Sequence, residues 1–303
     1  MAGVSAAAVL HEARSLLRGA GLRAGLLVRD LGTGEEIGLE PDAVFPSASL
    51  VKVPLAVATL ERIERGELDG ATELRVGPGD AGAPGPPGIS RFRHPATVAV
   101  DDLLYLAVAV SDGVAADALF DLTPPDRVRA ELARLGIEGI AVRHVVRDLT
   151  DTPAERFPDG EVHLAHVLAR SAGTGGRGHA VAQLDVTRAN SGSARAHVDL
   201  LQALWLPSAV APPVAARVRA LLAANLHRQR LTPDFATDAA RWSSKTGTLL
   251  NLRHEVGVVE HADGQRFAVA ALSESQVAAV SQPGAEAVLG QVARQLRDVL
   301  RGG

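Results

Sequence analysis

The sequence contains no cysteine among its 303 residues. Disulfides, thiolate metal ligands and cysteine nucleophiles are therefore excluded, while the cellular compartment is left open. Basic charge is not in excess either, since the net charge is −4 and the sequence pI is about 6.2. A nucleic-acid-binding protein would show a basic patch or a high pI. Nucleic acid is therefore not an expected partner.

Long apolar segments are also missing. No stretch reaches the roughly 18 apolar residues that cross a membrane, so no membrane partner is expected. Residues 1–21 form an Ala-rich segment that carries Glu12, Arg14 and Arg18 and lacks the apolar run and cleavage site of a signal peptide. The chain as written is therefore expected to be cytoplasmic. Secretion is the alternative if translation starts upstream.

Metal-binding patterns are sparse among the ten histidines. The nearest is the pair His163 and His166, which lacks the His-Glu-x-x-His context of a zinc hydrolase, so ordinary helix or loop histidines are the better interpretation. No metal and no other cofactor is expected. The remaining composition, 47% hydrophobic and 22% charged, is typical of a soluble globular protein with a substantial core.

Apolar periodicity and turn residues divide the chain into helices, strands and loops. Strands are predicted at 25–28, 36–39, 241–246, 255–260 and 266–272. Helices are predicted at 5–18, 53–65, 114–122, 126–135, 194–204, 214–231 and 285–300. Residues 98–110 fit a strand or a helix by composition, and Asp101 as N-cap with the apolar residues after it favours a helix. The Gly- and Pro-rich segment 77–88 and the polar segment 144–190 are expected to be irregular.

This order of elements predicts an α/β (α+β) fold. The simplest packing joins the first two strands to the last three in one antiparallel five-stranded sheet, flanked by the terminal helices. The other helices then form an all-helical lobe. Because no repeat or linker is visible, residues 1–303 are expected to be a single domain. Its α/β lobe would span about 1–47 and 208–303, and its helical lobe about 48–207.

The segment from Ser49 to Lys52 is the first candidate for chemistry. Ser49 stands where an extended segment gives way to a helix, and residues three apart on a helix share a face. The Lys52 amine is therefore expected within reach of the Ser49 hydroxyl. A serine becomes a nucleophile when a nearby base accepts its proton, and a lysine can be that base when burial or neighbouring cations lower its pKa. Alone, this common pattern is better interpreted as a helix start with a solvated lysine.

Two later motifs offer partners for this pair. A Ser-Asp-Gly motif begins at Ser111 and interrupts an apolar helix, where a hydroxyl can relay a proton to a leaving group. A Lys-Thr-Gly-Thr motif begins at Lys245 and ends a predicted strand. Its lysine supplies positive charge, its hydroxyls suit a substrate carboxylate, and its glycine lets the backbone approach a ligand closely. Each motif alone fits an ordinary loop or edge strand, but their order and placement together indicate one site.

The three motifs resemble the Ser-x-x-Lys, Ser-Asp-Asn and Lys-Thr-Gly signature of class A β-lactamases and penicillin-binding proteins. The resemblance is closest to class A β-lactamase-like serine hydrolases. It covers nearly the whole chain, including the N-terminal helix and hairpin, Phe45 ahead of the nucleophile, the final strands and the C-terminal helix. It implies the fold of that superfamily and an acyl-enzyme mechanism. The implied partner is a small-molecule substrate, namely a β-lactam, amide or ester.

The resemblance also implies roles for individual residues. Ser49 would attack the carbonyl, Lys52 would take its proton, and Ser111, close to Lys245, would pass a proton to the leaving group. The oxyanion hole would consist of the backbone N–H groups of Ser49 and Thr248. The implied substrate-binding residues are Gly113, Thr246, Gly247, Thr248 and Arg253. For Arg253, a solvated strand-end arginine is an equal alternative.

The sequence departs from the family pattern in residues linked to deacylation. Gly113 replaces the Asn of the second motif, and Asp117 stands where these enzymes usually carry an Asn that steadies the deacylation loop. The Glu-x-x-Leu-Asn string, whose Glu activates the deacylating water, is absent from residues 140–190. The carboxylates of that region, each better interpreted as a solvated loop residue, are Asp148, Glu155, Asp159 and Glu161, with Asp148 best placed by its separation from Ser111. Acylation by a β-lactam is therefore expected to leave a long-lived adduct, and Lys52 would activate water for other acyl donors.

Two other functions stay open. A cytoplasmic esterase or acyl transferase of small-molecule metabolism fits the lack of an export signal, and a D-alanyl-D-alanine carboxypeptidase fits it less well. A non-catalytic ligand-binding member of the fold is the third class of function. It is disfavoured because a pure binder has no need of Ser49, Lys52, Ser111 and Lys245 together.

Overall fold

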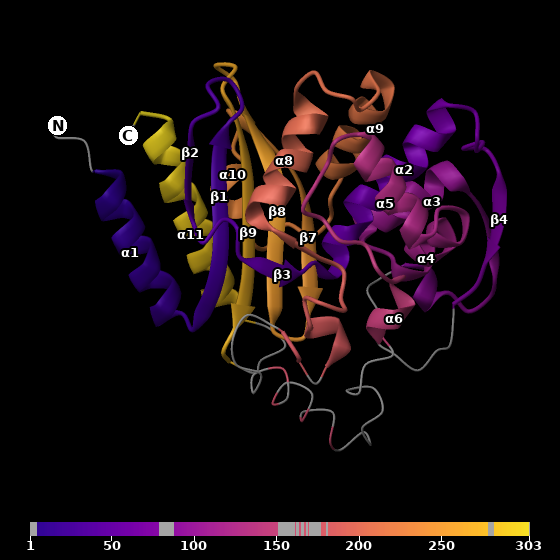
Figure 1. Ribbon diagram of the computed structural model, residues 1–303, viewed down its shortest axis with the longest axis horizontal. Coiled ribbons are helices and arrows are strands. Elements are labelled where there is room, and N and C mark those ends of the chain that lie inside the picture. Colours follow the sequence, from indigo (N-terminus) through magenta and orange to yellow (C-terminus); the bar gives the residue numbers. More distant parts are fainter. Residues whose placement is uncertain are drawn as a thin grey trace.

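An antiparallel five-stranded sheet forms the centre of the molecule (Figure 1). The computed structural model describes residues 5–78, 88–150, 161, 164, 167, 169, 177–179, 181–277 and 282–302. The strand order β2-β1-β9-β8-β7 places the first two strands beside the last three, which confirms the predicted sheet. Its strands are β1 (Leu22–Asp30), β2 (Glu36–Leu39), β7 (Ala240–Leu249), β8 (Leu252–His261) and β9 (Arg266–Ser275).

Helices cover both faces of this sheet. The terminal helices α1 and α11 pack together on one face, and α8 lies against the other (Figure 1). Helices α2, α3, α4 and α5 gather in a second lobe (Figure 1). The helices are α1 (Ala6–Gly19), α2 (Lys52–Glu64), α3 (Val100–Tyr105), α4 (Gly113–Leu122), α5 (Pro125–Arg134), α6 (Arg147–Thr150), α8 (Ala194–Trp205), α9 (Pro212–Ala223), α10 (Thr232–Phe235) and α11 (Pro283–Leu300).

Alternation along the strands explains why both faces of the sheet are buried. In β1, Leu26 packs in the apolar layer of the terminal helices, whereas Leu27 packs in the layer that contains α8. In β9, Phe267 likewise packs in the layer of the terminal helices, and Ala268 packs in the layer that contains α8. Successive side chains of a strand point to opposite faces, so apolar residues at consecutive positions serve two cores.

The second lobe is not wholly helical, so the prediction of an all-helical lobe was wrong. A short antiparallel ribbon of β4 (Glu73–Val76) and β5 (Ala96–Ala99) precedes α3. The helix favoured within 98–110 forms, but it begins at Val100, with Ala99 rather than Asp101 at the N-cap, and it continues as a π-helical turn, η3 (Leu106–Val110). A second ribbon pairs β3 (Val44–Pro46) with β6 (Ser191–Ser193). Short 3-10 turns occur at η1 (Ala48–Val51), η2 (Ile89–Arg91) and η6 (Ala182–Leu184).

The long helix predicted at 214–231 is interrupted. Helix α9 ends at Ala223, and α10 begins at Thr232. Between them, the Leu226 N–H donates to the Ala109 carbonyl (3.0 Å), and the His227 N–H donates to the Asn225 side chain (3.0 Å). These partners replace the helical ones, because a side-chain acceptor and a tertiary contact compete with the i−4 carbonyl.

Several predictions concern residues outside the described part of the chain. They include most of the loop at 77–88, the His163 and His166 pair, and two candidate carboxylates, Glu155 and Asp159. No helix in the described ranges combines the length and the apolar character that a membrane crossing requires.

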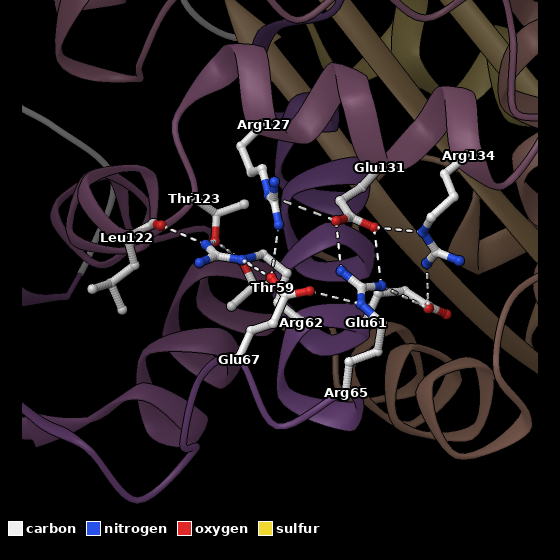
Figure 2. A network of polar contacts seen from close by, with 10 residues as sticks. All are labelled: Thr59, Glu61, Arg62, Arg65, Glu67, Leu122, Thr123, Arg127, Glu131 and Arg134. Atoms are coloured by element: carbon white, nitrogen blue, oxygen red, sulfur yellow. Dashed lines mark hydrogen bonds and ion pairs between the residues drawn. The ribbon is translucent and has the colours of Figure 1, made fainter.

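An ion-pair network fastens α2 to α5 (Figure 2). The buried carboxylate of Glu131 accepts from Arg65 (2.6 and 3.1 Å) and from Arg134 (2.9 Å). Arg134 also donates to the buried Glu61 (2.6 Å). The members of the network are Thr59, Glu61, Arg62, Arg65, Glu67, Leu122, Thr123, Arg127, Glu131 and Arg134. It anchors the C-terminal half of α2, the helix whose first residue is Lys52.

Candidate active site

Ser49 lies in a tight turn between a strand and a helix, as predicted. Strand β3 ends at Pro46, the 3-10 turn η1 contains Ser49, and α2 begins at Lys52. The residue before the serine, Ala48, has φ of +46°, a left-handed conformation that is strained for a residue with a Cβ. The Ser47 N–H donates to the Asn190 carbonyl (2.7 Å) and ties the turn to the segment that enters β6.

Two lysine amines meet at the hydroxyl of Ser111. Lys245 Nζ, from β7, donates to Ser111 Oγ at 2.8 Å and to the Thr246 carbonyl at 2.9 Å. Lys52 Nζ donates to the Ser111 carbonyl at 2.5 Å and lies 3.5 Å from Ser111 Oγ. Among the described residues, no hydrogen bond joins Lys52 to the Ser49 hydroxyl. The amine is held at Ser111 instead, and catalytic hydrogen bonds often form only when substrate is bound.

Burial makes both lysines weak holders of a proton. Burial lowers the pKa of Lys52 to about 8, although the charges of Asp112 and Asp117 oppose the shift. Burial, and next the charge of Lys52, lower the pKa of Lys245 well below its usual value, with Glu255 opposing. A neutral amine is therefore accessible near neutral pH, and a general base requires this state.

Asp112 shapes the loop that presents Ser111. Its fully buried carboxylate caps α4 by accepting the helix's second and third N–H groups (2.8 and 3.1 Å), and it also accepts the Ile89 N–H (2.6 Å). Ser111 itself has φ of +66°, directly after the π-helical turn. The next residue, Gly113, opens α4, and a Cβ there would lie 3.3 Å from a methyl carbon of Val146.

Strand β7 presses against the turn that carries Ser49. A Cβ at Gly247 would lie 2.9 Å from the Ser47 carbonyl oxygen and 3.1 Å from Leu50 Cγ. Backbone cannot yield at such a distance, so only glycine allows this approach. On either side, Thr246 is buried and Thr248 is exposed. The structure thus brings the three motifs of the sequence together at one place.

A family model described as the β-lactamase enzyme family matches residues 9–300. The chain belongs to the β-lactamase enzyme family. Within it, the chain is a serine hydrolase of the β-lactamase type, which confirms the resemblance of the three motifs. A curated relative, the β-lactamase regulatory protein BlaB of Streptomyces cacaoi, is 63% identical over 304 residues and covers 97% of both chains.

Solved β-lactamase-like structures share the fold of this chain. One is a mutant of PBP-A in an acyl-enzyme complex with penicillin G, with a TM-score of 0.75, 19% identity, and coverage of 97% of this chain and 96% of the other. Another is a β-lactamase of Sphaerobacter thermophilus, with a TM-score of 0.75, 20% identity and coverage of 98% and 99%.

The β-lactamase-like site contains two buried arginines on the side of Thr248. The predicted one, Arg253, lies opposite Thr248 in the β7–β8 register. It is 4% exposed, its Nη1 donates to the Leu250 and Leu252 carbonyls (2.6 and 2.7 Å), and its Nε lies 3.4 Å from Glu286. The Arg253 side chain is therefore buried, and its guanidinium contacts two backbone carbonyls and the Glu286 carboxylate rather than solvent.

Arg230 is a candidate that the sequence did not reveal. It is 1% exposed, and its Nη2 lies 3.3 Å from Thr248 Oγ1 and 3.1 Å from Glu286. Its Nε has no hydrogen-bond partner in the described part of the chain. No local pattern marks this residue, because it lies in the irregular segment before α10 and reaches Thr248 only through the fold.

Asp117 holds the start of the loop that would carry a deacylation base in a β-lactamase. Its Oδ1 accepts the Val146 N–H (2.7 Å) and the Arg147 N–H (3.2 Å). An Asn oxygen would make the same two bonds, so the loop-steadying contact persists with a carboxylate in its place. Burial raises the pKa of Asp117, and the backbone hydrogen bonds oppose the shift.

The candidate deacylation carboxylates that the structure describes lie in solvent. Asp148 is exposed, and its carboxylate accepts the Val145 N–H of its own loop (3.3 Å). Glu161 is also exposed. Neither residue has the buried environment expected of a carboxylate that acts as a general base.

Proposed function

We propose that this member of the β-lactamase family forms an acyl-enzyme through Ser49 with a small-molecule β-lactam, amide or ester. The observation that carries the proposal is the Ser111 hydroxyl, which lies 2.8 Å from one buried lysine amine and 3.5 Å from another. Burial of two lysine amines away from water lowers stability. Such a cluster is typical of a functional site, where the shifted pKa values serve the chemistry.

The proposed chemistry begins with proton transfer from Ser49 to the neutral amine of Lys52. Ser49 Oγ forms a bond to the substrate carbonyl carbon, and the oxyanion is stabilised by the N–H groups of Ser49 and Thr248. As the bond to the leaving group breaks, Ser111 passes its proton to that group and is reprotonated from the lysine pair. The acyl group then remains on Ser49.

Recognition of a substrate carboxylate is assigned to the end of β7. The hydroxyls of Thr246 and Thr248 offer hydrogen bonds, and Arg230 adds positive charge through its contact with Thr248. Arg253, on the neighbouring strand opposite Thr248, would add further positive charge while its guanidinium stays bonded to the Leu250 and Leu252 carbonyls. Charge-assisted hydrogen bonds of this kind are stronger than neutral ones.

Deacylation is proposed to be slow for β-lactams. The exposed positions of Asp148 and Glu161 support this proposal, because an exposed carboxylate is a weak base for activating water. A mutant of PBP-A, which shares the fold, has been solved as an acyl-enzyme complex with penicillin G. For a less hindered ester, Lys52 would serve as the base for water.

Labelling with a fluorescent penicillin, run beside nitrocefin hydrolysis, tests this function. We expect labelling that outlasts the reaction time by hours, little nitrocefin turnover, and complete loss of label in Ser49→Ala. Ser47→Ala is the matched control, since Ser47 is a buried serine two residues away whose hydroxyl has no partner within the described residues. Label retained in Ser49→Ala would refute the nucleophile, and rapid nitrocefin turnover would refute slow deacylation.

An esterase or acyl transferase is the alternative enzyme. A panel of aryl esters separates it, because the penicillin would then give no label while the esters are hydrolysed in a Ser49-dependent reaction. If no acyl donor reacts, the ligand-binding function remains, and equilibrium binding of the same compounds tests it.

A second candidate function is favoured by the relative that is 63% identical and named a β-lactamase regulatory protein. In this function, the acylated or ligand-bound chain would be the signal that changes β-lactamase production. The test replaces the gene for the relative in Streptomyces cacaoi with one for this chain and measures β-lactamase activity with and without a β-lactam. Restoration by the wild type but not by Ser49→Ala would link regulation to acylation, and failure of both would exclude this role.

A further inference from the structure

We propose that His254 is a positioning residue that holds the turn carrying Ser49 against the sheet. The inference rests on the proposed function of Ser49 and concerns a residue outside the three motifs. His254 lies on β8, directly opposite Gly247 in the β7–β8 register. It therefore belongs to the part of the sheet that touches the nucleophile turn.

Both ring nitrogens of His254 are committed to backbone groups. Nε2 lies 2.8 Å from the Pro46 carbonyl oxygen, and Nδ1 accepts the Ser273 N–H at 3.0 Å. A carbonyl is only an acceptor, so Nε2 carries the proton and Nδ1 carries the lone pair. The imidazole is thus a bridge in one tautomer between the end of β3 and strand β9.

This bridge is rigid and does not titrate in the working range of pH. The side chain is 0% exposed, and burial lowers the pKa of His254 to about 3. The ring of Phe45 packs edge-on against it, with centroids 6.1 Å apart. A neutral, fixed imidazole has no part in proton transfer at neutral pH, so its contribution is geometric.

The turn needs such a restraint because it contains strain. Ala48 has φ of +46°, and a strained residue keeps its conformation only when its surroundings fix it. The turn is held at Pro46 by His254, at Ser47 by the Asn190 carbonyl (2.7 Å), and from below by Gly247. Without the first of these contacts, η1 can relax, and Ser49 loses its alignment with the amine and the oxyanion hole.

Two substitutions separate the contacts of His254. In His254→Gln, the side-chain amide places a donor where Nε2 lies and keeps the Pro46 contact while losing the Ser273 contact. In His254→Asn, the shorter side chain places an acceptor near the position of Nδ1 and keeps only the Ser273 contact. A positioning role predicts that Gln retains acylation and Asn does not, whereas a role in strand pairing alone predicts the reverse.

The experiment measures the rate constant for labelling by fluorescent penicillin, with an aryl ester as second acyl donor, and hydrogen exchange of peptides spanning residues 45–52. We expect His254→Asn to lower the labelling rate about 100-fold, the cost of a displacement of about 1 Å at a reacting group. The pH profile should keep its position, and exchange at Ser47 and Leu50 should accelerate. His254→Gln should stay within about fivefold of the wild type. Val258→Ala, a buried change on the same strand, controls for lost stability and should label at the wild-type rate.

Equal labelling rates in the Asn and Gln variants, or unchanged exchange in residues 45–52 of His254→Asn, would overturn the inference. The exchange measurement does not depend on acylation. If the wild type reacts with no acyl donor, the proposed function fails, while faster exchange in the Asn variant alone would still support the tether and unchanged exchange would refute it.

Discussion

The two ends of α2 carry charged clusters that are built in opposite ways. At its first residue, Lys52 shares the Ser111 hydroxyl with Lys245, and neither amine forms an ion pair with a described residue. Near its last turn, Arg62 and Arg65 lie in a network in which every carboxylate contacts at least one guanidinium (Figure 2). The first residue of α2 therefore meets a second lysine amine without an ion-pair partner in the described part of the chain, whereas its last turn lies in a network of ion pairs.

The difference shows what separates a reactive charge from a structural one. A helix N-terminus is positive, so a cation in the first residue of α2 is disfavoured by the dipole as well as by burial. A buried lysine can lose its proton and become neutral, whereas a buried arginine stays charged and needs a carboxylate partner. Under the proposed function, the end at Lys52 would supply a base, and the end at the ion-pair network would supply stability.

The largest expected effect is that of Lys52→Met, which removes the buried amine at the first residue of α2. Labelling by fluorescent penicillin should fall about 10³-fold, the middle of the range for loss of a general base. At pH 7, protonation of Lys52 is less favourable in the folded state than in the unfolded state, where the lysine has its usual pKa of 10.5. A folded pKa of about 8 makes that cost about 3 kcal/mol. The free energy of unfolding in urea should therefore rise by up to about 3 kcal/mol.

Arg62→Met on the same helix is the matched control. Arg62 donates to Thr123 and Glu67 (3.0 and 3.2 Å), so its loss should lower the free energy of unfolding and leave labelling unchanged. Equal destabilisation by both variants would remove the contrast between the two ends of α2.

Glu131→Leu breaks the ion-pair network. The substitution removes one of the two carboxylates that Arg65 and Arg134 share, the other being Glu61. Removal of one member of a buried network costs about 3 kcal/mol. Urea unfolding measures this loss, and Glu64→Leu, an exposed residue on α2, should change stability by less than about 0.5 kcal/mol. A loss as small as that of the control would show that the network contributes little.

Asp117→Asn sharpens the comparison by removing a negative charge near the end at Lys52. Both side chains offer Oδ1 to the Val146 and Arg147 N–H groups, so the loop contact persists. The charge of Asp117 raises the pKa of Lys52, so its removal should lower that pKa. Under the proposed function, the acylation rate should rise as Lys52 loses its proton near pH 8. In the variant, this rising limb of the pH profile should move to lower pH by less than about one unit. Asp121→Asn on the same helix is the control, because it removes a negative charge that also contacts Arg147. A rising limb of the pH profile that stays in place or moves to higher pH in Asp117→Asn would contradict the assignment of this limb to Lys52.

Glu67→Gln should give the smallest effect, at the edge of the network. Hydrogen bonds from Arg65 and then Arg127 lower the pKa of Glu67 to about 2, whereas an unfolded Glu titrates near about 4.3. Its contribution to stability is therefore present above about pH 4.3 and is lost as the pH falls toward 2. The difference in Tm between pH 6 and pH 3 should shrink slightly in the variant, and 1 M salt should shrink it in the wild type. An unchanged difference in both would contradict this role.

Local patterns predicted the sheet and the three motifs of the site. Short apolar runs joined by the hairpin signal at 261–265 mark β8 and β9. The order of Ser49, Ser111 and Lys245 is readable because each lies in a short motif. The same local logic failed at 214–231, where the Leu226 N–H bonds Ala109, a residue distant in the chain. It also missed the β4–β5 ribbon, whose strands of four residues each are too short for periodicity to decide.

Residues that reach the site through the fold could not be predicted. Arg230 contacts Thr248 from a segment without regular pattern, and His254 contacts Pro46 across 208 positions. The direction of Lys52 was also beyond local reasoning, since its amine bonds Ser111 rather than Ser49. In each case the position of the side chain depends on which distant backbone atoms offer a partner.

The His254 bridge has a consequence for the order in which the protein assembles. The Pro46 contact spans 208 positions, and the contact between Ser111 and Lys245 spans 134. Contacts between residues so distant in the chain form late, because the entropy of closing a long loop is lost before the contact can stabilise the structure. During synthesis, Ser49 leaves the ribosome long before the strands that hold its turn. Reactivity toward an acyl probe would therefore report completion of the whole chain, and nascent chains that end before β8 should remain unlabelled.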